Sequence, residues 1–229
     1  MNEKTNFSCR FCDSQLDTIF LDLGVTPSAN SFLKKENLSS EKSFPLRVFV
    51  CNKCLLVQLP ETIDPNELFS DYAYFSSFSE TWLKHAEDYV DMVISRFDIK
   101  HSSQIMEIAS NDGYLLKNFV NRNIPVLGIE PASNVADTAI KNGIPTLKEF
   151  FSAKTANEIK EKNGLADLLI GNNVLAHVPN INDFISGLKI LLSSNGIITM
   201  EFPHILQLIQ NNEFDTIYHE HFSYFSFIT

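Results

Sequence analysis

The sequence predicts an α/β fold, in which an open parallel β-sheet covered on both faces by helices follows a small cysteine-bearing domain. Two observations support this prediction. From about residue 104 onward, short apolar runs alternate with amphipathic segments, as expected for buried parallel strands joined by helices. All four cysteines, by contrast, lie between residues 9 and 54. A chain of 229 residues is long enough for two domains, and we expect the boundary between residues 75 and 76.

The cysteines form two pairs, Cys9-x-x-Cys12 and Cys51-x-x-Cys54. Two such pairs can supply four thiolates to one tetrahedral Zn²⁺. A redox-active pair is the alternative, but there are two pairs, and neither lies in a strand–helix–strand context. Four protein ligands leave no open coordination position, so we expect zinc to stabilise residues 1–75 rather than to catalyse a reaction. Short strands are expected there at residues 18–23, 46–51 and 55–59.

A helix is expected at residues 80–97, because apolar residues from Trp82 to Phe97 recur on one helical face. The segments after it alternate between strand and helix. The expected strands are residues 105–109, 126–130, 145–147, 166–171 and 196–202. The expected helices are residues 113–121, 134–141, 153–162 and 183–192. In such a sheet, ligands bind at the carboxyl ends of the strands.

Small and polar residues follow three of these strands. Glu130, at the end of the second strand, can accept hydrogen bonds from ribose hydroxyls, which indicates a nucleoside cofactor, either NAD or S-adenosylmethionine (SAM). The turn after the first strand lacks the GxGxxG glycines that fit a dinucleotide pyrophosphate, and the acidic Glu107 suits a cationic sulfonium, so SAM is favoured. The candidate cofactor-binding residues are Glu107, Ala109, Ser110, Asn111, Gly113, Glu130, Pro131, Asn172 and Asn173.

Four proton-handling side chains stand in a row near the end of the chain, as Tyr218-His219-Glu220-His221, and are flanked by aromatic and apolar residues. Ionisable groups in apolar surroundings cost free energy unless they are paired, so this run indicates a functional site. A surface loop with two histidines is the alternative. Two further candidates are open. His177 could be a core or a pocket residue, and Tyr72 could pack on a sheet face or contact a substrate.

Composition narrows the classes of partner. The net charge of −10 and the pI of about 5.0 argue against nucleic acid and against an anionic membrane surface as partners. No apolar run approaches the roughly 20 residues needed to span a bilayer. The first residues lack the apolar stretch of a signal peptide. A cytoplasmic protein is therefore expected.

Seven motifs, taken together, resemble the SAM-dependent C-methyltransferases that act on nucleotide-linked keto-deoxysugars. In chain order they are Cys9-Arg10-x-Cys12, Cys51-x-x-Cys54, Tyr72-x-Tyr74-x-Ser76-Ser77, Glu107-Ile108-x-Ser110-Asn111-Asp112-Gly113, Gly128-Ile129-Glu130-Pro131, Asn173-Val174-Leu175-Ala176-His177-Val178-Pro179 and Asp215-Thr216-Ile217-Tyr218-His219-Glu220-His221. The resemblance covers the whole chain. It implies a zinc-binding domain at residues 1–75 and a Rossmann-like class I methyltransferase domain at residues 76–229. Family members are longer, so their C-terminal sugar-binding domain is expected to be absent here.

The resemblance also implies a reaction, namely methylation of a ring carbon, C3, of a dTDP-linked or similar 4-keto-deoxysugar. The ketone acidifies the neighbouring C–H, a base removes that proton, and the enolate attacks the methyl group of SAM. By resemblance His221 is the base, while Tyr218, Glu220, His177 and Tyr72 position the sugar and stabilise the enolate.

Three alternatives to this reaction are open. The first is a truncated, non-catalytic remnant that binds SAM, zinc or a partner chain. The second is an NAD-dependent sugar-modifying enzyme. The third is a nucleic-acid methyltransferase, which the negative charge disfavours. Self-association or a separately encoded C-terminal domain could complete the molecule.

Overall fold

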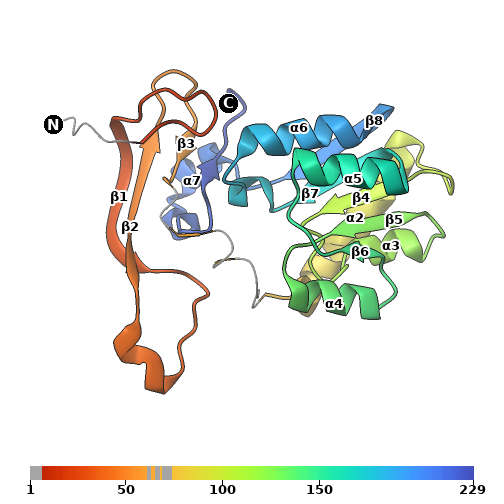
Figure 1. The fold of residues 1–229 in the computed structure, drawn as a ribbon, viewed down its shortest axis with the longest axis horizontal. Coiled ribbons are helices and arrows are strands. Elements are labelled where there is room, and N and C mark those ends of the chain that lie inside the picture. Colours follow the sequence, from red (N-terminus) through yellow and green to blue (C-terminus); the bar gives the residue numbers. More distant parts are fainter. Residues whose placement is uncertain (1–6, 61–62, 65–67, 69–73) are drawn as a thin grey trace. The chain divides into compact units, whose positions relative to one another are not determined.

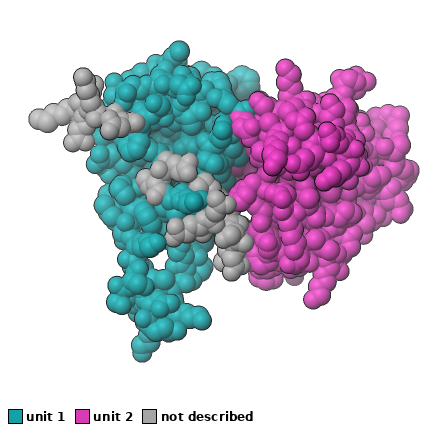
Figure 2. Space-filling view, viewed as in Figure 1, with its two compact units in different colours: residues 1–68, 175–182, 202–229 teal, residues 69–174, 183–201 magenta. Residues whose placement is uncertain are grey.

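The computed structural model describes residues 7–60, 63–64, 68 and 74–229. They form two compact units (Figure 2). The first unit comprises residues 1–68, 175–182 and 202–229, and the second comprises residues 69–174 and 183–201. The first boundary between the two units, at residues 68 and 69, lies close to the expected domain boundary between residues 75 and 76. The first unit nevertheless includes two later segments, which the sequence-based division assigned to the second domain.

The second unit is built on a five-stranded parallel sheet with the order β6-β5-β4-β7-β8 (Figure 1). Its strands are β4 (Ile105–Ile108), β5 (Val126–Ile129), β6 (Thr146–Leu147), β7 (Ala166–Asn172) and β8 (Leu192–Glu201). The chain enters at the central β4, runs outward through β5 to β6, and returns to the other side through β7 and β8. The strand order thus reverses between β4 and β7, and ligands of open sheets bind outside the carboxyl ends at such a switch point. The expected α/β fold is confirmed.

Two helical segments precede the first strand, namely η2 (Ser76–Phe78), which was not expected, and α2 (Glu80–Phe97). The helices that join the strands lie within a few residues of their expected limits, and they are α3 (Leu116–Val120), α4 (Ser133–Lys141), α5 (Ala153–Asn163) and α6 (Ile181–Leu191). The longest, α2, has the bounds that its apolar periodicity predicts. Ser79 caps it by accepting a hydrogen bond from the Trp82 N–H, and Asp98 ends it in the left-handed conformation at φ 52°. Its buried side chains, Ala86 and Val90 among them, join the core formed with β4 and β7.

The first unit contains a four-stranded antiparallel sheet with the order β1-β2-β3-β9. Its strands are β1 (Thr18–Pro27), β2 (Ser43–Val50), β3 (Val57–Gln58) and β9 (Ser223–Tyr224). Its helical segments are η1 (Lys35–Ser40), η3 (Leu175–His177), α7 (Ile205–Asn211) and η4 (Phe214–Thr216). β3 is shorter than expected because Leu55, at φ 66°, belongs to the turn that carries the second cysteine pair.

Residues from both ends of the chain share the core of the first unit. Val57 pairs with Tyr224 and Gln58 pairs with Ser223 across β3 and β9. One apolar cluster contains Val48 and Leu59 from the N-terminal part together with Leu208, Ile217 and Tyr224 from the C-terminal part. The run Tyr218–His221 lies between these contacts and is therefore positioned by the cysteine-bearing unit. None of the helices in the described part of the chain has both the length and the hydrophobicity that a bilayer crossing requires.

Candidate functional site

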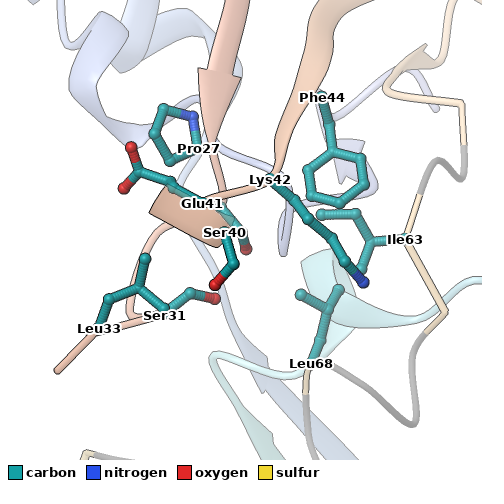
Figure 3. A pocket seen from close by; sticks show the side chains of 10 residues that line it. Pro27, Ser31, Leu33, Ser40, Glu41, Lys42, Phe44, Ile63 and Leu68 are labelled. Atoms are coloured by element: carbon teal, nitrogen blue, oxygen red, sulfur yellow. The ribbon is translucent and has the colours of Figure 1, made fainter. Parts of the chain in front are cut away.

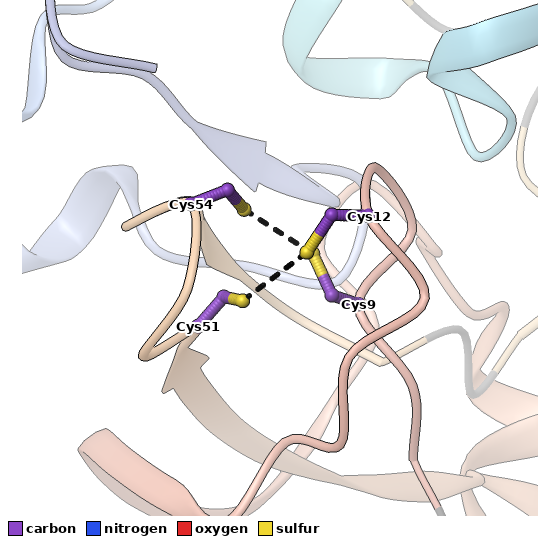
Figure 4. Close-up of side chains that lie close together, drawn as sticks. All are labelled: Cys9, Cys12, Cys51 and Cys54. Carbon is purple, nitrogen blue, oxygen red and sulfur yellow. Dashed lines mark hydrogen bonds between the residues drawn. The ribbon is translucent and has the colours of Figure 1, made fainter.

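The side chains of the four cysteines point toward one another (Figure 4). Their sulfur atoms all lie within 4.8 Å of one another, with 3.5 Å between Cys9 and Cys54 and 3.6 Å between Cys12 and Cys51. In a tetrahedral Zn(Cys)₄ site, Zn–S bonds of about 2.3 Å separate neighbouring sulfurs by roughly 3.8 Å. The geometry of the cluster therefore fits zinc, and Cys9 and Cys51 are fully buried while the other two are not.

The two cysteine pairs have the same backbone geometry. The N–H of Asp13 donates to the Cys9 carbonyl, and the N–H of Leu55 donates to the Cys51 carbonyl, each at 2.9 Å. Asp13 and Leu55 both have positive φ angles, 58° and 66°, which are uncommon outside glycine. Each turn thus folds back to bring its two sulfurs to one point, and a ligand held by all four sulfurs would offset the strain.

The Tyr218–His221 run forms a buried turn, so the alternative of a surface loop is wrong for these residues. His219 and Glu220 are each 2% exposed and His221 is 8% exposed. The turn is fixed by a hydrogen bond from the His221 N–H to the Tyr218 carbonyl, and the following Phe222 donates its N–H to Ala176. That second bond brings η3, and with it His177, to the same place in the first unit.

Two imidazole rings and one phenol meet in this turn. The ring centroids of His177 and His221 are 4.7 Å apart, and those of Tyr218 and His221 are 4.1 Å apart. The Tyr218 hydroxyl lies 2.9 Å from His221 Nε2, and His221 Nδ1 lies 2.8 Å from the carbonyl oxygen of Thr216. Because a carbonyl only accepts hydrogen bonds, Nδ1 must carry the ring proton, which leaves the lone pair on Nε2.

The other two polar side chains of the turn are held by the N-terminal segment. Glu220 Oε1 accepts a hydrogen bond of 2.8 Å from the Asn30 amide, and His219 Nε2 lies 3.3 Å from the carbonyl oxygen of Phe44. The Phe44 ring also packs edge-on against His219, with 5.9 Å between centroids.

The N-terminal segment that holds this turn also lines a pocket of about 190 Å³. Phe44 lines it, and so do the serines on either side of Asn30 in sequence, Ser28 and Ser31. Its other lining residues are Pro27, Leu33, Ser40, Glu41, Lys42, Ile63 and Leu68. Figure 3 shows apolar Phe44, Ile63 and Leu68 on one side of the pocket and Ser31 and Leu33 on the other.

The pKa values of these groups are shifted mainly by burial. Burial lowers the pKa of His221 to about 4, although its hydrogen bond to Thr216 acts in the opposite direction. Burial and the neighbouring His221 lower the pKa of His177 to about 3. Burial and the charge of Glu220 raise the pKa of Tyr218 to about 12. Both histidines are consequently neutral and the phenol is protonated near pH 7.

A separate acidic cluster occupies the switch point of the second unit. Glu107 is fully buried at the end of β4, and in the described part of the chain neither of its carboxylate oxygens has a hydrogen-bond partner. Burial raises the pKa of Glu107 well above its usual value, and the charges of Glu130 and Asp112 add to this effect. A cationic ligand at this position would relieve both the repulsion and the missing hydrogen bonds.

The turn after β4 has the shape needed to approach a ligand closely. Ala109 and Asn111 have φ angles of 56° and 49°, both in the left-handed region. Glu130, after β5, accepts hydrogen bonds from the N–H groups of Asn111 and Ala132, each at 2.9 Å. Gly128 leaves room for the Ser110 side chain, because a Cβ at this position would clash with Ser110 Oγ at 2.4 Å and force it to move. Ser110 Oγ is buried with no hydrogen-bond partner among the described residues, so it too can bind a ligand.

The structure describes the positions of the other candidate cofactor-binding residues, but not that of Tyr72. Gly113 adopts φ +79° within the turn, and Pro131 is the second residue after β5. Asn172 is the last residue of β7, and Asn173, at φ 52°, follows it. Tyr72 lies outside the described residues.

Known families match both parts of the chain. Residues 9–69 match the family described as "Putative zinc binding domain", and residues 82–227 match the family described as "Methyltransferase domain". The second match covers more than half of the chain. The chain belongs to the methyltransferase domain family. The Tyr218–His221 turn and the acidic cluster around Glu107 therefore belong to a methyltransferase chain that also carries a zinc-binding domain.

Individual relatives agree with this assignment. C-methyltransferase NovU of Streptomyces niveus is 37% identical over 221 residues, which is 95% of this chain and 52% of NovU. The methyltransferase chain thus spans about half the length of this curated relative. Among solved structures, a SAM-dependent methyltransferase from Archaeoglobus fulgidus matches with a TM-score of 0.50 and 13% identity, over 65% of this chain and 69% of that chain. At this identity the likeness concerns the fold alone.

The methyltransferase cofactor SAM fits the acidic cluster of the second unit. SAM is cationic at its sulfonium and at its amino group, and Glu107 offers two buried carboxylate oxygens that have no hydrogen-bond partner among the described residues. We propose that Glu130, directly after β5, accepts hydrogen bonds from the ribose. The favoured choice of SAM over NAD, and the expectation of zinc at the cysteines, are both confirmed.

Sequence reasoning missed Asp112 as a site residue of the methyltransferase domain. The N–H of Ser77 donates to Asp112 Oδ2 at 3.2 Å, and the N–H of Ser76 donates to Asn111 Oδ1 at 3.0 Å. These bonds attach the segment before α2 to the turn after β4. The Tyr-x-Tyr-x-Ser-Ser and Ser-Asn-Asp-Gly motifs are both visible in the sequence. No local pattern, however, shows that these two segments contact each other.

The depressed pKa values predict that the methyltransferase chain loses stability in mild acid. An unfolded histidine binds a proton below about pH 6.5, whereas folded His221 does so only near pH 4. Protons therefore favour unfolding between these two values. For His221 alone the effect reaches roughly 3 kcal/mol at the acid end of this window.

Urea denaturation between pH 7.5 and 4.5 measures this effect. The free energy of unfolding should fall with pH less steeply in His177→Asn than in the wild type, because one buried titrating ring has been removed. His101→Asn, at an exposed histidine, is the control and should keep the wild-type slope. Equal slopes in all three proteins would contradict the prediction. Acid release of zinc contributes to every variant and cancels in the comparison.

Proposed function

We propose that the chain catalyses SAM-dependent methylation of a ring carbon, C3, of a nucleotide-linked 4-keto-deoxysugar, with His221 as the base. The main support is the arrangement of hydrogen bonds around the His221 ring. Nδ1 donates to the Thr216 carbonyl, so Nε2 holds the lone pair and lies 2.9 Å from the Tyr218 hydroxyl. A ring that is already neutral at pH 7 can accept a proton without first losing one.

The residues of the turn would share the work of proton transfer. The C4 ketone acidifies the C3 proton, Nε2 of His221 accepts that proton, and negative charge develops on the ketone oxygen. Tyr218 keeps its proton, because its pKa is raised to about 12, and its hydroxyl can therefore donate a hydrogen bond to the enolate oxygen. To do so the substrate must displace the Tyr218–His221 hydrogen bond.

Glu220, His177 and Tyr72 have supporting roles in this proposal. The Glu220 carboxylate, oriented by Asn30, would stabilise the positive charge that His221 gains. His177, in ring contact with His221, would limit the positions that His221 can adopt, and Tyr72 would contact the sugar. SAM, when bound, supplies an electrophilic methyl group to the enolate carbon and leaves as S-adenosylhomocysteine.

Two observations support the substrate class. The similar protein NovU is named a C-methyltransferase, which favours carbon as the methyl acceptor. The pocket lined by the N-terminal segment contains Lys42 and the hydroxyls of three serines, together with the Phe44 ring. Such a lining suits the oxygen-rich groups and the flat base of a sugar nucleotide.

An exchange experiment tests the proposal directly. The purified chain is incubated in D₂O with a dTDP-4-keto-6-deoxysugar, with and without SAM, and the products are followed by NMR and mass spectrometry. We expect exchange of the C3 proton without SAM, and a product heavier by one methylene group with it. Calorimetry should show binding of SAM and none of NAD. Binding of SAM with neither exchange nor product would contradict the proposal and favour a non-catalytic binding module.

A further inference from the structure

We infer that Arg10 is a positioning residue, which couples the zinc-binding cysteines to the pair formed by His177 and His221. The inference rests on the proposed function, because it concerns the placement of the proposed base. Arg10 stands between Cys9 and Cys12, yet its side chain reaches three segments that surround the two histidines. All of these groups belong to the first unit.

The guanidinium group binds the polypeptide on both sides of the histidine pair. Arg10 Nη1 donates to the carbonyl oxygen of Pro179 at 2.7 Å, two residues after His177. Arg10 Nη2 donates to the carbonyl oxygen of Leu59. The carbon of the guanidinium lies 5.2 Å from the ring centroid of Phe222, the residue directly after His221. One side chain thus contacts the segments of both histidines.

The three contacted segments are also bonded to one another. Phe222 donates its N–H to Ala176 at 2.7 Å, and its carbonyl accepts the N–H of Leu59 at 3.0 Å. Phe222 itself is 1% exposed. Since Ala176 and Phe222 each adjoin one histidine of the pair, the 4.7 Å separation of the two rings depends on this small network. Arg10 closes the network from the side of the cysteines.

The backbone of Arg10 is fixed by the cysteine site. Its N–H donates to Gln58 Oε1 at 2.9 Å, and Gln58 Nε2 donates to Cys9 Sγ at 3.1 Å. Gln58 is 1% exposed and belongs to β3. Zinc bound by Cys9 and Cys12 would hold in place the two ends of the short loop that contains Arg10. The position of the guanidinium, and through it of Pro179 and Phe222, therefore follows from the cysteine geometry.

Only arginine can make this set of contacts. Its planar group donates in two directions at once and can stack on an aromatic face, whereas a lysine ammonium is a single compact charge on a flexible stem. Arg10→Lys therefore keeps the charge but should lose one of the two carbonyl contacts and the ring contact. The histidine pair should then loosen without loss of the metal ligands.

The test compares Arg10→Lys and Arg10→Met with the wild type, all as zinc-loaded protein with ¹⁵N-labelled histidine. Imidazole NMR signals are recorded at one pH and assigned with the variants His177→Asn and His221→Asn. Zinc content, SAM affinity and steady-state kinetics are measured on the same samples. Arg47→Lys is the matched control, because Arg47 lies in the same sheet and pairs with Asp22 at the surface.

We expect both Arg10 variants to shift the signals of His177 and His221 and to leave zinc content and SAM affinity unchanged. Loss of the histidine geometry should lower kcat by about tenfold or more and change KM less. Removing zinc from the wild type with a chelator should shift these two signals together with those of the other histidines of the first unit, because that unit depends on the metal. The emission of Trp82, the single tryptophan and part of the second unit, should not change.

Two results would overturn the inference. One is unchanged signals of His177 and His221 in Arg10→Lys with zinc retained. The other is loss of zinc from Arg10→Lys, since Arg10 would then act by retaining the metal. Arg10→Lys keeps the test valid even if Arg10→Met fails to fold. Because the NMR readout needs no turnover, shifted signals in a chain without methyl transfer would uphold the coupling and count against the proposed function alone.

Discussion

His221→Asn is expected to slow methyl transfer by about 10²–10⁴-fold while leaving SAM binding intact. Asparagine has no basic nitrogen, so nothing remains at the position of Nε2 to accept the C3 proton. A positioned general base typically accounts for about 10²–10⁴ in rate, and we expect kcat to fall within this range. Exchange of the C3 proton in D₂O should slow together with methylation, because both require the same proton abstraction.

The expected separation of turnover from cofactor binding has a structural reason. His221 belongs to the first unit, whereas Glu107, Glu130 and the turn after β4 belong to the second. Calorimetry with SAM therefore tests the proposed cofactor site of the second unit separately from His221. A loss of SAM affinity as large as the loss of turnover would refute the assignment of His221 as the base. His101→Asn, at an exposed position of the second unit, should retain full turnover and shows whether a histidine replacement is harmful in itself.

Cys51→Ser is expected to release zinc and unfold the first unit. Structural zinc contributes about 10–16 kcal/mol in small zinc-binding peptides, and whole domains are stable by only about 5–15 kcal/mol. The loss of one thiolate therefore removes a large part of the free energy that keeps this unit folded. One apolar cluster of this unit contains all four cysteines, so unfolding of the cysteine turns also disrupts the packing around them.

Zinc analysis, circular dichroism and SAM calorimetry together check this prediction. We expect no bound zinc, loss of β-sheet signal, loss of turnover, and retention of SAM binding by the second unit. Lys53→Ala is the matched control, because Lys53 is exposed in the same loop and only its backbone N–H contacts Cys51. A Cys51→Ser chain that stays fully folded without zinc would refute the structural role of the metal.

Much of the fold could be predicted from local sequence patterns. Residues 80–97 have a helical period, and α2 has those bounds. The central strands β4 and β5 are buried, mainly apolar runs, and each strand of the parallel sheet lies within a few residues of its expected place. The spacing within the two cysteine pairs predicts that their four sulfurs bind one metal ion. In each case the signal lies within one short segment, and it does not depend on distant residues.

The arrangement of the first unit could not be predicted in this way. β9 has two residues and no periodicity, so nothing in the sequence reveals that it pairs with β3. The hydrogen bond between Asn30 and Glu220 joins residues 190 positions apart. The sequence placed His177 after the fourth strand of the parallel sheet, but its contacts with His221 arise because η3 packs against the segment of β9. Such partnerships are properties of the tertiary structure.

The pairing of β3 with β9 has a consequence for biosynthesis. The cysteine-bearing sheet needs a strand that the ribosome makes more than 160 residues after β3, so it cannot be completed while the chain is emerging. The residues of the parallel sheet, by contrast, form one nearly continuous stretch and can fold first. Until residue 224 has left the exit tunnel, the edge of β3 and its apolar face are uncovered and open to aggregation. Early binding of zinc to the two cysteine turns would limit that exposure during synthesis.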